Sequence, residues 1–127
     1  MTVFQRLIFS CLVMAATPSC TQQPPELTAL QHSLQQQYPG VQFDVALVPA
    51  VHRLDVTADS AAWRGYKLDE QQRRNIGQAM ARFVVAHYAG STPVETVTIR
   101  FIEERSRSLL SKGWASNDVS FPVTALH

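Results

Sequence analysis

The sequence predicts an α+β fold, a two-layer sandwich in which two helices cover one face of a four-stranded, mostly antiparallel sheet. Two segments carry apolar residues at the three- and four-residue spacing of an amphipathic helix, and four segments alternate apolar with polar residues as half-buried strands do. The segments follow one another in the order helix, strand, strand, helix, strand, strand. Because each has only one apolar side, a layer of helices on a sheet is the arrangement that buries them all.

The first helix is expected to begin at Pro25 or Glu26, since proline is well tolerated at the first position of a helix. Pro39 and Gly40 end it. The apolar residues along its predicted buried side are Leu27, Leu30, Leu34 and Tyr38. Glutamines occupy most of the opposite side, which is typical of a solvated helix surface.

Two alternating segments, 41–47 and 52–57, predict a hairpin with its turn near Pro49 and Ala50. Centring the turn between these two residues places all the apolar side chains of the hairpin on one face. The pairs on that face are Leu47 with His52, Val45 with Leu54, and Phe43 with Val56. On the other face, the same register sets Asp44 directly opposite Asp55.

Two carboxylates opposed in a sheet repel each other, so Asp44 and Asp55 need an explanation. They could bind a cation, or form an acid pair in which one pKa is raised, as in a small-ligand site or a weak hydrolase. Alternatively, Arg53 and Arg100 from a neighbouring strand neutralise them at the surface.

The loop of residues 59–67 contains Trp63 and Tyr66 on either side of a glycine. Two aromatic residues in a loop could form a recognition surface. They could also hold the loop over the edge of the core, which is the commoner use of such residues. Together with the hairpin charges they complete a candidate binding surface, whose members are Asp44, Arg53, Asp55, Arg100, Trp63 and Tyr66.

The second helix is predicted from Asp69 to Tyr88, with Asp69 as N-cap and Gln72 as its capping-box partner. Gly90 follows its end, as is usual after a helix. Its predicted apolar side contains Ile76, Met80, Phe83, Val84 and His87. Gly77 in the middle indicates either a bend or the close approach of another backbone.

Two further strands are predicted after this helix. In the first, Val97, Ile99 and Phe101 alternate with polar residues, and the charged residues 103–107 are expected to leave it in solvent. Residues 119–123 form the last strand. Pro122 within it has no N–H to donate, which restricts this strand to an edge of the sheet or shortens it.

The first twenty residues differ from the rest of the chain. Arg6 precedes an apolar run from Leu7 to Thr17 that is too short to span a bilayer but has the length of a signal-peptide core. The polar residues 21–25 follow it. We therefore expect a signal peptide over 1–19, a tether over 20–25 and a single α+β domain over 26–127.

The residues Thr17, Pro18, Ser19 and Cys20 resemble the lipobox of bacterial lipoproteins, with Thr17 in place of the usual Leu. The resemblance covers this segment alone. It implies cleavage before Cys20, whose thiol then carries a diacylglycerol, and Thr21 after it implies delivery to the outer membrane, facing the periplasm. Ordinary secretory cleavage near Ser19 and an uncleaved anchor are the alternatives.

Composition and motifs exclude some functions. The net charge of +1 comes from 11 basic and 10 acidic residues, and it becomes zero without Arg6, which argues against nucleic-acid binding. The four histidines lack the close spacing of a metal motif, although His52 and His87 are each expected on an apolar side and could meet in the core. No nucleophile motif is present. We therefore expect no cofactor, no metal and no enzymatic activity.

The leading hypothesis is a non-enzymatic lipoprotein of the cell envelope, anchored in the membrane by its lipid, that binds an envelope protein. An uncovered sheet face and an edge strand containing a proline are surfaces that a partner could use. The alternatives are a small-ligand or cation-binding domain centred on Asp44 and Asp55, and a purely structural accessory domain. The expected uncovered face contains Gln42, Asp44, Arg53, Asp55, Thr96, Thr98 and Arg100.

Overall fold

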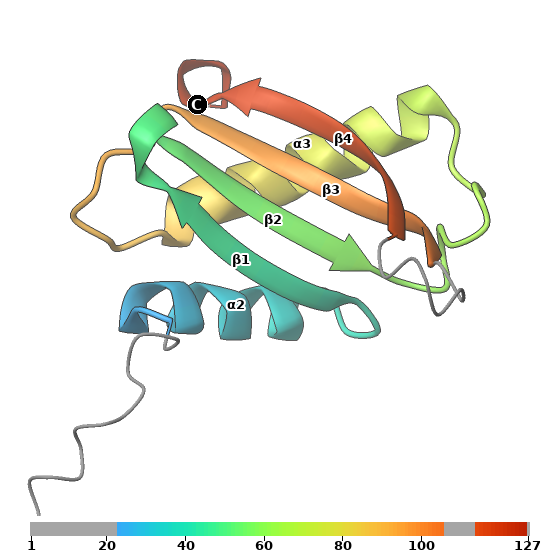
Figure 1. The fold of residues 1–127 in the computed structure, drawn as a ribbon, viewed down its shortest axis with the longest axis horizontal. Coiled ribbons are helices and arrows are strands. Elements are labelled where there is room, and N and C mark those ends of the chain that lie inside the picture. Colours follow the sequence, from blue (N-terminus) through green and yellow to red (C-terminus); the bar gives the residue numbers. More distant parts are fainter. Residues whose placement is uncertain (1–22, 106–113, 127) are drawn as a thin grey trace, which may run out of the picture.

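The computed structural model describes residues 23–105 and 114–126 (Figure 1). The predicted signal peptide, Cys20 and part of the predicted charged exit therefore lie outside the described residues. The described elements are α2 (Pro25–Gln37), β1 (Gln42–Val48), the short 3₁₀ helix η2 (Pro49–Val51), β2 (Arg53–Asp59), α3 (Glu70–His87), β3 (Thr96–Arg105), β4 (Trp114–Pro122) and the 3₁₀ helix η3 (Val123–Ala125).

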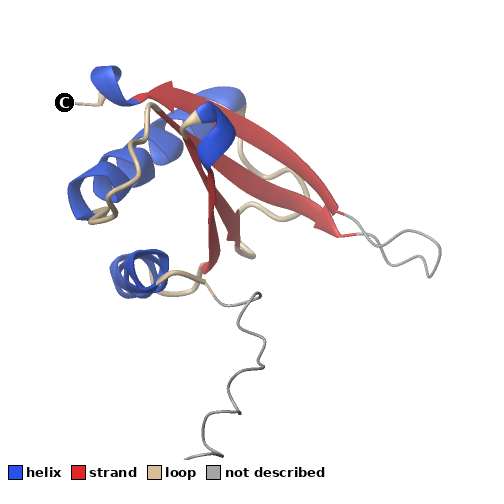
Figure 2. Cartoon of the chain, turned by 60° about the vertical axis from the view of Figure 1, so that its left-hand side comes forward, coloured by secondary structure: helices blue, strands red, loops and turns tan. Residues whose placement is uncertain are grey.

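The strands form one sheet in the order β1-β2-β3-β4, and both helices cover the same face of it, as Figure 2 shows. β1 and β2 are antiparallel, as are β3 and β4, whereas β2 and β3 are parallel. The parallel pair follows from the crossover through α3, which returns the chain to the starting end of the sheet. The predicted α+β class, element order and mostly antiparallel sheet are confirmed.

Helix α3 has the predicted start. The Asp69 carboxylate accepts a hydrogen bond from the Gln72 N–H at 2.7 Å, and the Gln72 amide oxygen accepts one from the Asp69 N–H at 2.9 Å. Gly77 lies in the buried face of α3, where a β-carbon would lie 3.4 Å from the Phe121 ring and 3.6 Å from the Phe101 ring, which are ordinary contact distances. The nearest groups to this glycine are thus aromatic side chains and not a second backbone.

Helix α2 buries its predicted leucines against β1. At its end, Tyr38 packs against Phe43 of β1 and Phe83 of α3, with ring centroids 6.0 and 6.3 Å apart. The core between the layers therefore joins both helices to the sheet. Its most deeply buried members are Leu30, Leu34, Leu54, Val56, Met80, Val84, Val97, Ile99 and Phe101.

The hairpin register differs from the predicted one by two residues. Leu47 pairs with Leu54, and Asp44 pairs with Thr57 instead of Asp55. The reason is the turn, which is a 3₁₀ helix that ends at His52 in the left-handed conformation, with φ of +52°. Because the shift is an even number of residues, each side chain keeps its predicted face.

Candidate functional site

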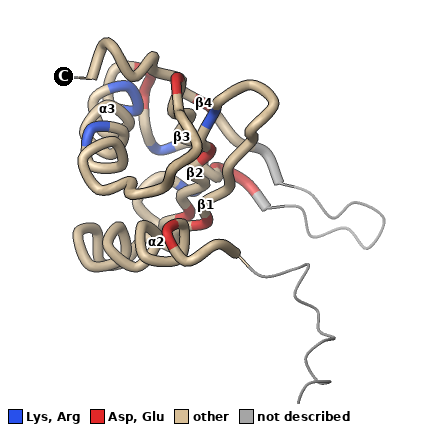
Figure 3. The backbone as a smooth tube through the Cα atoms, turned by 90° about the vertical axis from the view of Figure 1, so that its left-hand side faces the viewer, with Lys and Arg blue, Asp and Glu red and all other residues tan. Residues whose placement is uncertain are grey.

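The uncovered face of the sheet contains a row of alternating charges on β2, β3 and β4 (Figure 3 marks the charged positions). The Arg53 guanidinium donates to both oxygens of Asp55, from Nε at 2.6 Å and from Nη2 at 3.3 Å. Arg100 donates from Nη2 to the same carboxylate at 3.4 Å, and its Nε lies 3.6 Å from Oδ2 of Asp118. We call Arg53, Asp55, Arg100 and Asp118 the charge row.

Arg53 and Arg100 of the charge row neutralise Asp55, as one of the two sequence interpretations predicted. The hydrogen bond to Asp55, followed by the charge of that carboxylate, raises the pKa of Arg53 above its ordinary value. Beside the row, Thr98 and Ser120 share a hydrogen bond between their hydroxyls at 2.8 Å. This surface can make polar contacts with a partner, but its members already bind one another.

The opposed pair of Asp44 and Asp55 predicted from the sequence is wrong, because the longer turn sets Asp55 opposite Ala46. Asp44 is exposed on β1, opposite Thr57. Among residues 23–105 and 114–126, no group of three or more His, Cys, Asp or Glu side chains could hold a metal ion. The cation site and the acid pair therefore lose the geometry on which they depended.

The two aromatic residues of the 59–67 loop lie apart from the charge row. Trp63 is buried, donates from Nε1 to the Ala58 carbonyl at 3.1 Å, and packs edge-on against Phe101 with centroids 5.2 Å apart. Tyr66 is 54% exposed and donates to a Glu104 carboxylate oxygen at 2.8 Å, which raises the pKa of the phenol. Trp63 thus clamps the loop to the core, and Tyr66 remains at the surface.

The histidines do not meet in the core. The His52 side chain is 45% exposed and its Nδ1 lies 3.2 Å from a Glu95 carboxylate oxygen. His87 is exposed on the last turn of α3, where its ring stacks on Phe83. His52 lies at the surface because the backbone turns there in the left-handed conformation. His87 lies at the surface because the buried side of α3 includes the small residues Gly77 and Ala81 and is rotated away from the predicted side.

Strand β4 leaves its outer backbone groups unpaired with any strand that the structure describes, because it is the last strand of the sheet. The Val123 N–H donates to the Glu95 carbonyl at 2.9 Å, which continues the β3–β4 register by one pair. In an antiparallel ladder alternate residues bond the same neighbour, so Phe121 and Val119 face β3, whereas Asp118 and Ser120 direct their N–H and C=O groups outward. Pro122 also faces outward, where its missing N–H removes no bond to β3.

Strand β1, the opposite edge, has its outer groups occupied by side chains. The Phe43 N–H donates to the Gln35 amide oxygen of α2 at 2.7 Å. The Val45 carbonyl accepts from Gln23 Nε2, also at 2.7 Å. Gln23, which the sequence assigned to the tether, thus bonds to the folded domain, and α2 begins at Pro25, one of its two predicted first residues.

Residues 103–107 were predicted to leave the strand in solvent, and this prediction is wrong for Glu103. Its side chain is 1% exposed on the helix-covered face, at a bulge between Ile102 and Glu104 in the β3–β4 pairing. Asn117 Nδ2 donates to one carboxylate oxygen at 2.6 Å, and Arg73 Nη1 lies 3.6 Å from the other. Arg73 and Asn117, both partly exposed, therefore surround the buried Glu103 carboxylate and form a polar cluster that joins α3 to β3 and β4.

A polar hollow of about 300 Å³ lies between the first turns of α3 and β4. Glu70, Arg73 and Arg74 line it from the helix. Residues 117–120 line it from the strand, including Asp118 and Ser120, whose backbone groups point outward. Asp118 was not predicted as part of the last strand, because Asn117 interrupts the apolar alternation of the strand's later residues. The alternation of Ser116, Asp118 and Ser120 was the signal that could have extended it.

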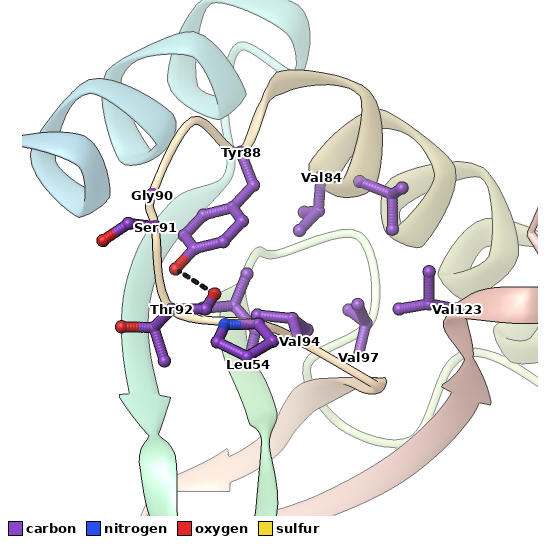
Figure 4. A pocket seen from close by; sticks show the side chains of 11 residues that line it. Leu54, Val84, Tyr88, Gly90, Ser91, Thr92, Val94, Val97 and Val123 are labelled. Atoms are coloured by element: carbon purple, nitrogen blue, oxygen red, sulfur yellow. Dashed lines mark hydrogen bonds between the residues drawn. The ribbon is translucent and has the colours of Figure 1, made fainter.

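A second cavity, of about 230 Å³, lies at the other end of α3 (Figure 4). Leu54, Val84 and Val97 form apolar walls, and none of the residues that line it is charged. Tyr88 closes one side by donating to the Thr92 carbonyl at 3.0 Å. A β-carbon at Gly90 would overlap the Tyr88 hydroxyl and ring, so glycine lets this loop pack on the ring.

Comparison with protein-family models, with curated proteins and with solved structures finds nothing that matches this chain. Neither helix in the described part of the chain has both the length and the apolar character needed to cross a membrane.

Proposed function

We propose that this chain is a non-enzymatic lipoprotein of the bacterial cell envelope that binds a protein partner along the outer edge of β4. The observation that carries the proposal is the difference between the edges: glutamine side chains occupy outer groups of β1, while Asp118 and Ser120 of β4, whose outer groups pair with no described strand, line a hollow. An unpaired strand edge is a template for a further strand, and proteins usually cover or block one that has no use.

The lipid anchor proposed at Cys20 fits this orientation. Gln23 is held against β1 by its bond to Val45, and its amide oxygen accepts from the Thr28 hydroxyl at 3.2 Å. An extended chain from Cys20 to Gln23 spans at most roughly 11 Å. The anchor would therefore hold α2 and β1 toward the outer membrane, and β4 is the strand at the opposite edge of the sheet.

Metabolic labelling with a fatty-acid probe tests the anchor. The full chain should incorporate the probe, and Cys20→Ala should abolish incorporation. Cys11→Ala is the matched control, because Cys11 lies within the predicted signal peptide and should not carry the label. Labelling that persists in Cys20→Ala would contradict the proposed anchor.

Photocrosslinking in intact cells tests the binding edge. A photoreactive residue at Ser120, whose backbone faces outward on β4, should give a discrete crosslinked species with a second protein. The same residue at Gln36, which is exposed on α2, is the control and should not give that species. Equal crosslinking at both positions, or none at Ser120, would count against partner binding at this edge.

A further inference from the structure

We infer that the partner segment binds as an added strand in which a lysine or arginine lies directly opposite Asp118. This inference rests on the proposed function and specifies the chemistry of the partner. It follows from three features of β4: the direction of its outer backbone groups, the charge row that ends at Asp118, and the hollow beside the strand.

The backbone of β4 fixes where an added strand must lie. Asp118 and Ser120 each offer an N–H and a C=O group on the outer side, and Pro122 beyond them offers only its C=O. The hollow of about 300 Å³ runs along this same side, because Asp118 and Ser120 line it together with α3 residues. An extended segment can therefore approach the Asp118–Ser120 stretch, and pairing weakens at Pro122.

The charge row determines the sign of the facing side chain. Paired residues on adjacent strands share a face, so the partner residue opposite Asp118 lies on the uncovered face, in line with Arg100, which contacts Asp55 diagonally. The row runs from the Asp55 carboxylate to the Arg100 guanidinium and then to the Asp118 carboxylate. A cation on the fifth strand continues this alternation, whereas an anion there would face Asp118 directly.

Asp118 has capacity for this further contact. Its side chain is 42% exposed, with the Ser116 hydroxyl donating to Oδ1 at 3.0 Å and Arg100 Nε 3.6 Å from Oδ2. An ionised carboxylate has about four acceptor positions on its two oxygens. A lysine or arginine from the partner can therefore bind Asp118 without displacing Arg100.

Antiparallel pairing of β4 with β4 of a second copy does not supply the required cation. In an antiparallel pairing of two β4 strands, the residues that reach the uncovered face are Ser116, Asp118, Ser120 and Pro122. None of them is basic, so Asp118 would face a serine, a proline or the other Asp118. The alternation of charge therefore favours a different polypeptide as the partner.

Three fluorescent nonapeptides test the inference on the full chain. They share alternating threonine and valine and differ only in the central residue, which is lysine, glutamine or glutamate. Fluorescence anisotropy should show that the lysine peptide binds about five-fold more tightly than the glutamate peptide, with the glutamine peptide between them. The preference should decrease as salt is added, because exposed charges are screened.

Two variants locate the binding. Asp118→Lys should reverse the order, so that the glutamate peptide binds more tightly than the lysine peptide. Ser120→Pro removes an outward N–H and should weaken the binding of all three peptides. Ser120→Ala is the control: it also lacks the hydroxyl that bonds Thr98 but keeps the N–H, so peptide binding should be retained. Circular dichroism of each variant checks that the sheet is intact.

The inference is overturned if no peptide binds, if lysine and glutamate peptides bind equally, or if Asp118→Lys leaves their order unchanged. It is also overturned if sedimentation shows a dimer of the full chain that Ser120→Pro dissociates, because a second copy would then occupy the edge. Crosslinking at Ser120 without a lysine preference would leave the proposed function standing and refute the inference. A lysine preference in the peptide assay without any crosslinked protein in cells would count against the proposed function, and with it against a natural partner at this edge.

Discussion

Strands β1 and β4 are both edges of the same sheet, yet their outer backbone groups have different neighbours. On β1, the Gln35 amide oxygen accepts a hydrogen bond from the Phe43 N–H, and the Gln23 amide donates one to the Val45 carbonyl. Helix α2 lies alongside this strand. On β4, the corresponding groups face a hollow whose far wall is α3. Side chains from neighbouring elements, and not the sequence of the strand alone, therefore determine whether a sheet edge is available for pairing.

The largest effect is expected from loosening α2, which would make β1 resemble β4. Leu34 is fully buried between α2 and the sheet, so Leu34→Ala should lower the free energy of unfolding by about 3 kcal/mol through lost burial and the cavity that remains. Urea denaturation measures the change. Leu34→Met, which nearly conserves volume, is the control and should cost less than about 1.5 kcal/mol. Equal losses in both variants would show that packing at this position does not hold α2.

The next largest effect on stability is expected at the contact of α3 with β3 and β4 around Glu103. Arg73→Ala should lower the free energy of unfolding by about 2 kcal/mol, because it leaves the buried Glu103 carboxylate without its cation. Adding Glu103→Gln to that variant should recover part of the loss, since the uncompensated charge is removed. Denaturation of both single variants and the double variant measures the coupling. Strictly additive effects would mean that Arg73 and Glu103 do not interact.

A smaller effect tests whether the Gln35 side chain occupies the outer edge of β1. Gln35→Ala removes the acceptor for the Phe43 N–H and should cost about 1 kcal/mol. Gln35→Glu keeps an acceptor oxygen and should cost less, and Gln36→Ala on the exposed side of α2 should change stability by no more than about 0.5 kcal/mol. Hydrogen exchange of the Phe43 N–H offers a direct readout, and exchange that is unchanged in Gln35→Ala would contradict this occupation of the edge.

The smallest effect is on the pH dependence of the junction between α2, β1 and α3. Burial raises the pKa of Tyr38 above its ordinary value of about 10. The neutral phenol therefore stabilises the folded state fully below pH about 10, and this contribution is lost as pH rises through the raised pKa. The native chain should lose stability more steeply than Tyr38→Phe above that pH. Tyr66, whose pKa is also raised, contributes equally to both proteins. Parallel alkaline stability curves would refute this.

Regular periodicity made much of the fold predictable. The capping box of Asp69 and Gln72, the leucines of α2 and the alternation in β1, β2 and β3 each depend on local sequence, and the structure contains all of them. Pro122 was correctly assigned to an edge, since its constraint is covalent. These features needed no knowledge of distant neighbours.

The site was less predictable because it depends on register and on burial. The turn at 49–52 is a 3₁₀ helix, longer than the predicted turn, and alternation alone does not indicate its length. The predicted pairing of Asp44 with Asp55 was therefore wrong, although the sheet face of each strand residue was predicted correctly. Glu103 reads as a solvated charge in the sequence, and only the approach of Arg73 and Asn117 explains its burial. Arg53 and Arg100 were correctly expected to neutralise Asp55, because their strand positions followed from alternation.

The hydrogen bond between Gln35 and Phe43 also bears on how the chain reaches its native state. Only eight residues separate the two partners, so the loop that closes between them is short and its entropic cost is small. Pairing β2 with β3, in contrast, must wait for the whole crossover through α3 to form. The first strand is thus expected to be shielded from intermolecular association early in folding, before its sheet is complete.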